Sequence, residues 1–169
     1  MNNIIYPRFA ILMATFNGEK WISEQILSIL NQEKVNIDLY ISDDGSSDNT
    51  VKIIENLKKK YEHQIFFIKE RQETQIKSSA NNFIYLITKV NSNIYDYMAF
   101  SDQDDLWNNN KLIRAYSLIN DAKVDCYSSN VTALFNDGQK EILKKSSIQK
   151  EYDYIFESAG PGCTYVLSS

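Results

Sequence analysis

Short apolar runs alternate with helix-like stretches from residue 9 to residue 127. The runs at 9–14, 37–42, 65–68 and 97–101 are typical of buried strands, because each is brief, apolar and bounded by polar or turn residues. A further strand is expected at 124–127. This alternation predicts an α/β fold with a mostly parallel central sheet and helices on both faces.

Four helices are expected between these strands, since apolar residues recur there at spacings of three and four. Their stripes are Ile22, Ile26, Ile29 and Leu30; Val51, Ile54, Leu57 and Tyr61; Phe83, Leu86, Ile87 and Val90; and Leu112, Ile113, Tyr116 and Ile119. Ser78 or Ser79 is expected to cap the third helix. Beyond residue 127 the pattern changes: residues 131–135 and 141–143 flank Asn136-Asp137-Gly138, which predicts a small antiparallel hairpin.

Two acidic clusters follow predicted strands. Asp43 and Asp44 end the run at 37–42, and Asp102, Asp104 and Asp105 follow the run at 97–101. The carboxyl ends of parallel strands form the edge where ligands bind in α/β sheets. Side chains two residues apart can converge, so Asp102 and Asp104 are candidates to hold Mn²⁺ or Mg²⁺. The alternative is an acidic turn that caps the following helix.

The first cluster has a structural interpretation as well. Gly45 suits a turn with positive φ, and residues 46–48 offer helix caps. Two adjacent carboxylates exceed what a cap needs, so one of them could accept a hydrogen bond from the imide N–H of a pyrimidine. The strand exit at 14–18 lacks both phosphate-loop signatures. It is either a close approach to a ligand or an ordinary turn.

Composition narrows the function class. The 169 residues suit a single domain spanning 1–169, and the net charge of −4 argues against a nucleic-acid partner. No stretch reaches the length of a membrane span. The two cysteines, Cys126 and Cys163, are interpreted as reduced and buried, which fits a cytoplasmic chain. The last residues are strand-like, so we expect a fragment of a longer protein.

Five segments, in order, resemble the N-terminal part of family 2 glycosyltransferases, the inverting group with the GT-A fold. They are residues 9–18 (FAILMATFNG), 28–32 (SILNQ), 42–50 (SDDGSSDNT), 100–107 (FSDQDDLW) with Lys111-Leu112 behind it, and Gly162-Cys163. Within that family the chain is most similar to rhamnosyltransferase-type members. It departs from the family at 108–110, where a proline is usual, and at 70–82, where a glycine is usual.

The resemblance implies a role for each matched position. Asp44 would bind the nucleotide base and Asp43 would support the turn, while Asp104 would be the chief metal ligand, with Asp102 near the ribose or the metal. The remaining nucleotide-binding positions would be Ala14, Thr15, Phe16, Asn17, Lys77 and Gln103. The donor or acceptor pocket would be bordered by Asp105, Trp107, Gly162 and Cys163.

The resemblance also implies a substrate and a setting. The donor would be a UDP- or dTDP-sugar, and the acceptor a glycan or lipid-linked hydroxyl in cell-surface polysaccharide synthesis, at the cytoplasmic side of a membrane. Inverting transfer needs a carboxylate base, which the resemblance places beyond residue 169. We therefore expect this chain to bind donor with little or no transfer.

Other classes fit the residues less well. A phospho-receiver domain would want an acidic pair after the first strand and a late lysine. A sugar nucleotidyltransferase would want a glycine-rich basic loop there. A calcium-binding module would want a central Gly and a terminal Glu in its acidic loop.

Overall fold

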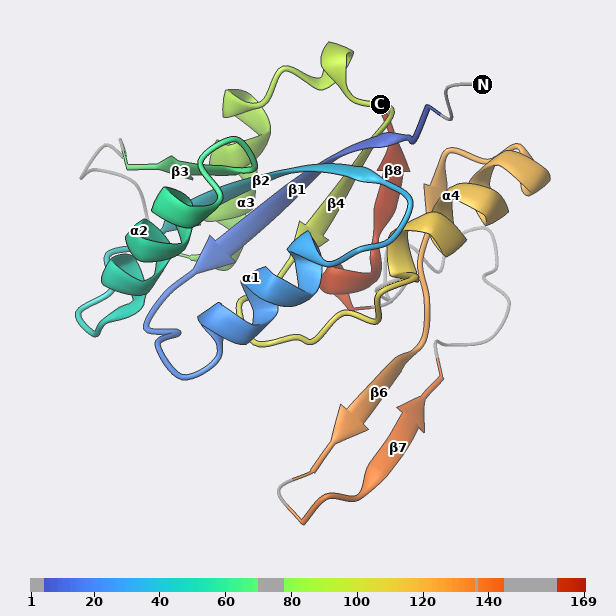
Figure 1. Ribbon diagram of the computed structural model, residues 1–169. Coiled ribbons are helices and arrows are strands. Elements are labelled where there is room, and N and C mark those ends of the chain that lie inside the picture. Colours follow the sequence, from blue (N-terminus) through green and yellow to red (C-terminus); the bar gives the residue numbers. More distant parts are fainter. Residues whose placement is uncertain (1–4, 70–77, 136, 145–160) are drawn as a thin grey trace.

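A computed structural model describes residues 5–69, 78–135, 137–144 and 161–169 (Figure 1). Its main sheet has six strands in the order β3-β2-β1-β4-β8-β5. The strands are β1 (Arg8–Thr15), β2 (Asn36–Asp43), β3 (Ile65–Ile68), β4 (Tyr97–Ser101), β5 (Cys126–Tyr127) and β8 (Val166–Ser168). β3, β2, β1 and β4 pair in parallel, whereas β8 pairs antiparallel with both β4 and β5. The predicted α/β fold with a mostly parallel sheet is confirmed.

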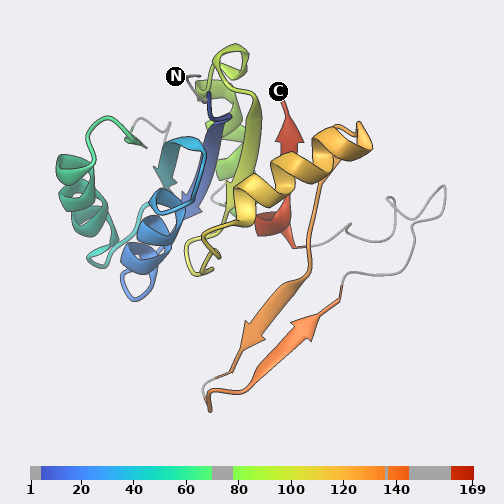
Figure 2. The ribbon, with the colours of Figure 1, turned by 45° about the vertical axis from the view of Figure 1, so that its right-hand side comes forward.

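The helices cover both faces of the sheet, as Figures 1 and 2 show. They are α1 (Ile22–Leu30), α2 (Thr50–Lys60), α3 (Ser79–Lys89) and α4 (Lys111–Ala122). Successive side chains of a strand point to opposite faces. In β1, Phe9 and Ile11 pack in the cluster that contains α1, α2 and α4, while Ala10 and Leu12 pack against Leu86 of α3. Because β1 is buried on both sides, its sequence is apolar from Phe9 to Ala14.

The predicted hairpin is present as a separate two-stranded sheet. It comprises β6 (Val131–Leu134) and β7 (Lys140–Leu143), which pair antiparallel, and it projects away from the main sheet (Figure 2). Gly138 has φ 84°, as a tight turn requires, and Asn136 lies outside the described residues.

Three sequence-based expectations about local structure were wrong. Ile87 is 44% exposed, because Asn82 and Leu86 define the buried face of α3 and the next residue turns away from it. The strand expected at 124–127 is shorter, since Lys123 is left-handed with φ 53° and the Val124 N–H bonds to the carbonyl of Ile119, which closes the end of α4. Cys126 is exposed because β5 is a short edge strand.

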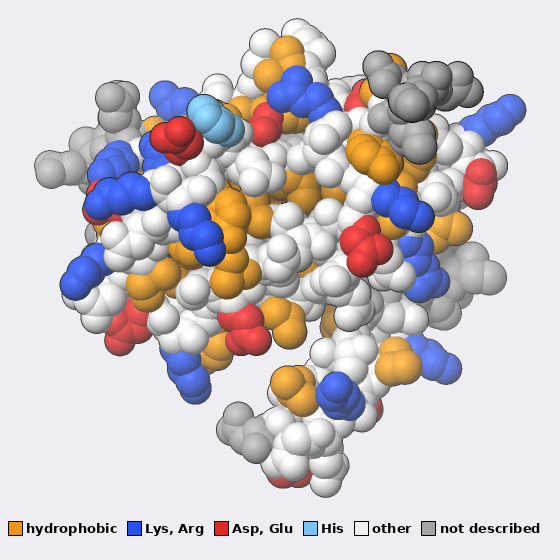
Figure 3. Space-filling view, in the orientation of Figure 1, with side chains coloured by type: hydrophobic (Ala, Val, Ile, Leu, Met, Phe, Trp, Pro, Cys, Tyr) orange, Lys and Arg blue, Asp and Glu red, His pale blue; other side chains and the backbone are white. Residues whose placement is uncertain are grey.

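On the face in Figure 3, positive and negative side chains are interspersed, without a continuous basic surface. In the described part of the chain, no helix combines the length and apolarity that crossing a bilayer demands.

Candidate nucleotide and metal site

A cleft of about 420 Å³ opens at the carboxyl edge of β1, β2 and β4. In Figure 1 this edge lies at the arrowheads of β1 and β4, next to the yellow loop that follows β4. The structure brings Asp44 of the first acidic cluster and Asp102 and Asp104 of the second to this cleft, although the clusters are far apart in sequence. Its lining comprises Ala14, Thr15, Phe16, Asp44, Ser78, Ser79, Asn82, Asp102, Gln103 and Asp104.

Asp43 and Asp44 have different surroundings. Asp43 closes the turn, because its Oδ2 accepts from the N–H groups of Gly45 and Ser46 at 2.9 and 2.7 Å. Gly45 has the expected positive φ of 88°. Asp44 is 7% exposed and lines the cleft, and its N–H donates to the carbonyl of Thr15 at 2.9 Å. The first carboxylate therefore shapes the loop, and the second one faces the cavity.

Asn17 fixes the end of β1 to this turn and is not part of the cleft lining. Its Oδ1 accepts from the Ser47 N–H at 2.8 Å, and its own N–H donates to Ser46 Oγ at 2.8 Å. Of the caps proposed at 46–48, Asp48 serves α2, because its Oδ1 accepts from the Thr50 N–H at 3.0 Å. Ser46 and Ser47 are used in the loop contacts instead.

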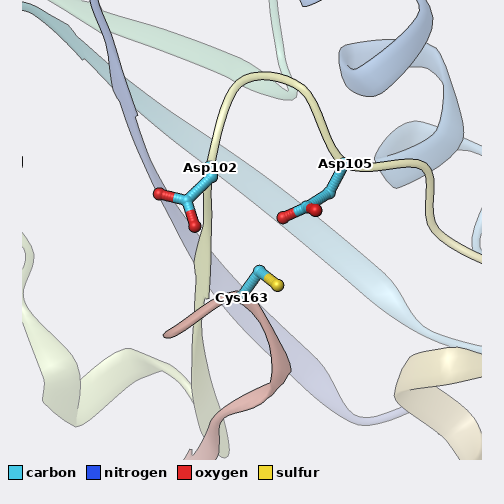
Figure 4. Close-up of side chains that lie close together, drawn as sticks. All are labelled: Asp102, Asp105 and Cys163. Atoms are coloured by element: carbon cyan, nitrogen blue, oxygen red, sulfur yellow. The ribbon is translucent and has the colours of Figure 1, made fainter. Parts of the chain in front are cut away.

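The loop after β4, residues 102–110, divides its carboxylates between two sides. Asp102 is half-buried and Asp104 is exposed, and both line the cleft. Asp105 lies on the other side, where ligand atoms of Asp102, Asp105 and Cys163 are within 4.8 Å of one another. Figure 4 shows these three side chains coming from the loop and from the 3-10 turn Gly162–Thr164. The spacing rule that paired Asp102 with Asp104 did not anticipate this second cluster.

Lys111 supplies a positive charge to the second cluster. Its Nζ donates to the carbonyl of Cys163. Burial lowers the pKa of Lys111 to about 7, although the nearby Cys163, Asp105 and Asp102 favour its charged form. Burial, followed by the hydrogen bond to Asp105 and the charge of that carboxylate, raises the pKa of the Cys163 thiol to about 12.

Carboxylates on both sides of the loop could hold a cation, and Asp102 is common to both sides. Burial raises the pKa of Asp102, and the charges of Asp105 and Asp104 raise it further, so added positive charge would relieve the crowding. On the Cys163 side Lys111, whose pKa is about 7, provides part of that charge. Asp102 and Asp104 both line the cleft, and carboxylate oxygens are ligands that Mn²⁺ or Mg²⁺ prefers.

Two polar residues of α1, together with Gln32 just beyond its end, contact this loop and the end of β4. Ser28 Oγ accepts from the Trp107 N–H at 3.1 Å, and Gln25 Nε2 donates to Ser101 Oγ at 2.8 Å. Gln32 Nε2 donates to the carbonyl of Asn108 at 2.8 Å. All three residues are buried, and Gln25 and Ser28 belong to a helix whose other inward positions are apolar. Polar residues within an apolar stripe were the available sequence signal, and the prediction missed their role.

Other predicted site residues lie in varied places. Trp107 is 5% exposed and packs in the main core, so its ring supports the loop from below. Cys163 lies beside the acidic loop and is buried as expected, whereas Gly162 is exposed. Lys77 lies outside the described residues. Ser78 caps α3 by accepting from the Asn81 N–H at 3.2 Å, which confirms one of the two expected caps.

Comparison with known proteins identifies relatives along most of the chain. The family described as Glycosyl transferase family 2 matches residues 10–163. A dTDP-rhamnosyl transferase of Shigella flexneri is 43% identical over 155 residues, which cover 92% of this chain and 53% of the relative. An Escherichia coli UDP-Glc:alpha-D-GlcNAc-diphosphoundecaprenol beta-1,3-glucosyltransferase is 28% identical, covering 94% and 58%. The chain thus spans about half the length of these relatives.

Solved structures share the fold. TarS 1–349 of S. aureus in complex with UDP superposes with a TM-score of 0.68 at 20% identity, covering 95% of this chain and 46% of that one. A mannosyltransferase of Pyrobaculum calidifontis, in complex with GDP-Man and Mn²⁺, gives 0.69 at 15% identity, covering 97% and 45%. Both the predicted fold and the resemblance read from the sequence are confirmed.

Proposed function

Because the chain belongs to glycosyltransferase family 2, we propose that its cleft binds a nucleotide-diphosphate sugar together with a divalent cation, for inverting transfer of the sugar to an acceptor hydroxyl. One observation carries this proposal: Asp44, Asp102 and Asp104 line a single cleft at the carboxyl edge of a parallel sheet. The volume of the cleft, about 420 Å³, is within the range of small-molecule sites.

Different residues of the cleft would bind different parts of the donor. Asp44 would accept a hydrogen bond from the imide N–H of a pyrimidine, next to the wall formed by Thr15 and Phe16. Asp102 and Asp104 would hold Mn²⁺ or Mg²⁺ beside the diphosphate. When bound, the cation supplies positive charge that stabilises the diphosphate as a leaving group. The base that takes the proton of the acceptor is assigned to none of the described residues.

The relatives guide the choice of substrate. A dTDP-sugar is the first donor to test, because the 43% identical relative is named a dTDP-rhamnosyl transferase, and a UDP-sugar is the second. The name of the E. coli relative includes a diphosphoundecaprenol acceptor. This name supports a glycan or lipid-linked acceptor for this chain. It also supports a reaction that takes place next to a membrane surface.

The proposal is tested by thermal shift with dTDP, UDP and GDP, each in Mn²⁺ and in EDTA. We expect dTDP or UDP to raise the melting temperature in Mn²⁺ and to do little in EDTA. Asp104→Asn should abolish the metal-dependent increment, whereas Asp121→Asn, on the exposed side of α4, should preserve it. Equal stabilisation in EDTA, or an unchanged increment in Asp104→Asn, would contradict the metal assignment.

A further inference from the structure

The amide of Gln103 bonds to the main chain of Phe16 as a neighbouring strand would. Its Oε1 accepts from the Phe16 N–H at 2.8 Å and from the Thr15 hydroxyl at 2.7 Å, and its Nε2 donates to the Phe16 carbonyl at 3.0 Å. The amide is therefore engaged by the protein itself, although the residue lines the cleft.

Gly18 provides the space for this amide. A Cβ added at Gly18 would lie 2.4 Å from Gln103 Oε1 and 2.7 Å from its Cδ. Gly18 does not have a positive φ, so backbone conformation alone would allow alanine there. The head of Gln103 is what requires a glycine at this position. An alanine would displace that flexible head while leaving residue 103 unchanged.

The hydrogen bonds between the Gln103 amide and residues Thr15 and Phe16, called the bridge below, join two walls of the cleft. Thr15 and Phe16 end β1 and form the wall proposed for the nucleoside, whereas Gln103 lies between the two proposed cation ligands in the loop after β4. We propose that Gln103 is a positioning residue which fixes the cation-binding loop relative to the nucleoside wall. This inference rests on the proposed function.

The physical consequence is coupling between nucleotide and cation. With the bridge intact, both walls are ordered before any ligand binds, so a metal-nucleotide complex can contact both without a further ordering cost. Without it, ligand binding must order the loop, and the cost appears only when both walls are used at once. The affinity for nucleotide in Mn²⁺ should then fall about tenfold, while the affinity in EDTA changes little.

The test compares Gln103→Ala, Gly18→Ala and the double variant with Gln139→Ala, an exposed glutamine of the hairpin. Calorimetry with dTDP and with UDP gives each Kd in Mn²⁺ and in EDTA. We expect both single variants to lose about tenfold in Mn²⁺. The double variant should lose no more than Gln103→Ala, because alanine at position 18 has nothing left to displace. The control should match the original chain.

Hydrogen exchange checks the bridge without ligand. The Phe16 amide should exchange faster in both single variants and at the original rate in Gln139→Ala. Lower melting temperatures with an unchanged ratio of the two Kd values would show a merely structural role and overturn the proposal, as would additive losses in the double variant. If the original chain bound neither nucleotide, the proposed donor site would be contradicted, and the inference that rests on it would be wrong as well.

Discussion

The Nζ atom of Lys111 lies 3.2 Å from the centroid of the Trp107 indole ring. Trp107 is buried in the main core, and Lys111 also donates to the carbonyl of Cys163. Lys111, the first residue of α4, thus links the acidic loop to the turn before β8. A cation held by an aromatic face, a carbonyl and nearby carboxylates is an organising centre for this side of the loop.

This centre predicts an unusual pH dependence of stability. The folded-state pKa of Lys111, about 7, is below its ordinary value of 10.5, because burial disfavours the charge. Between these values the unfolded chain binds more protons, so the contribution of Lys111 to stability increases as pH rises from about 7 toward 10.5. In Lys111→Met, which keeps the apolar stem, this contribution is absent.

The measurement is urea denaturation of both proteins in EDTA at several pH values from neutral upward. The stability of the original chain relative to Lys111→Met should rise by at most about 1.4 kcal/mol per pH unit. Titration of other groups in the unfolded state cancels in the difference. A difference that stays flat or falls with pH would contradict the depressed pKa.

Gln32 provides a second prediction, because its side chain caps α4 from the segment that follows α1. α4 begins without a side-chain cap from Asn110, and the Leu112 N–H instead donates to Gln32 Oε1 at 3.0 Å. Gln32→Ala leaves that N–H unpaired, which should cost about 1–3 kcal/mol. It also removes one of the two donors to the Asn108 carbonyl, which keeps the Lys111 N–H. Gln32→Glu keeps an acceptor near the helix N-terminus but loses the donor, so its cost should be intermediate.

Denaturant unfolding with Gln139→Ala as the matched control tests this order of stability. The expected ranking is original chain and control first, then Gln32→Glu, then Gln32→Ala. A Gln32→Ala variant within about 0.5 kcal/mol of the control would show that water replaces the lost partners.

Much of this fold could be predicted from periodicity, because β1 and β2 are short apolar runs and α1 and α2 have regular stripes. The contacts around the acidic loop could not. Glutamine is a residue type found mostly at protein surfaces. Gln25 and Gln32 are nevertheless buried, because the acidic loop passes over α1 and the residues that follow it. Likewise, the second cluster brings Asp105 rather than Asp104 close to Asp102, because the loop turns after Gln103. Local spacing cannot reveal which way a loop turns.

Asn82 gives a third prediction, at the floor of the cleft. It is 1% exposed, and its Nδ2 donates to the carbonyl of Ser42 at 2.9 Å, tying α3 to the end of β2. Asn82→Asp replaces this donor by a carboxylate facing a carbonyl. We expect it to destabilise the chain more at pH 7 than at pH 4, because protonation of the new carboxyl restores a donor.

Thermal unfolding of Asn82→Asp and of Asn56→Asp, an exposed site on α2, separates this effect from general acid destabilisation. The difference between the two variants should shrink as pH falls. If it stayed constant, the donor role of Asn82 would be wrong.

The two cysteines allow a final prediction, on thiol reactivity. Cys126 is exposed, whereas Cys163 is 7% exposed with its thiol pKa raised to about 12 by burial, by its hydrogen bond to Asp105 and by that carboxylate's charge. Since the thiolate is the nucleophile, iodoacetamide should modify Cys126 rapidly and Cys163 only after unfolding.

In a Cys126→Ser background, Asp105→Asn removes one negative charge beside the thiol, lowers its pKa and should accelerate labelling of Cys163, while Asp121→Asn should not. Intact-mass spectrometry over time at pH 8.5 follows both reactions, and folded Cys163 reacting as fast as Cys126 would show that the thiol is not held between the acidic loop and β8.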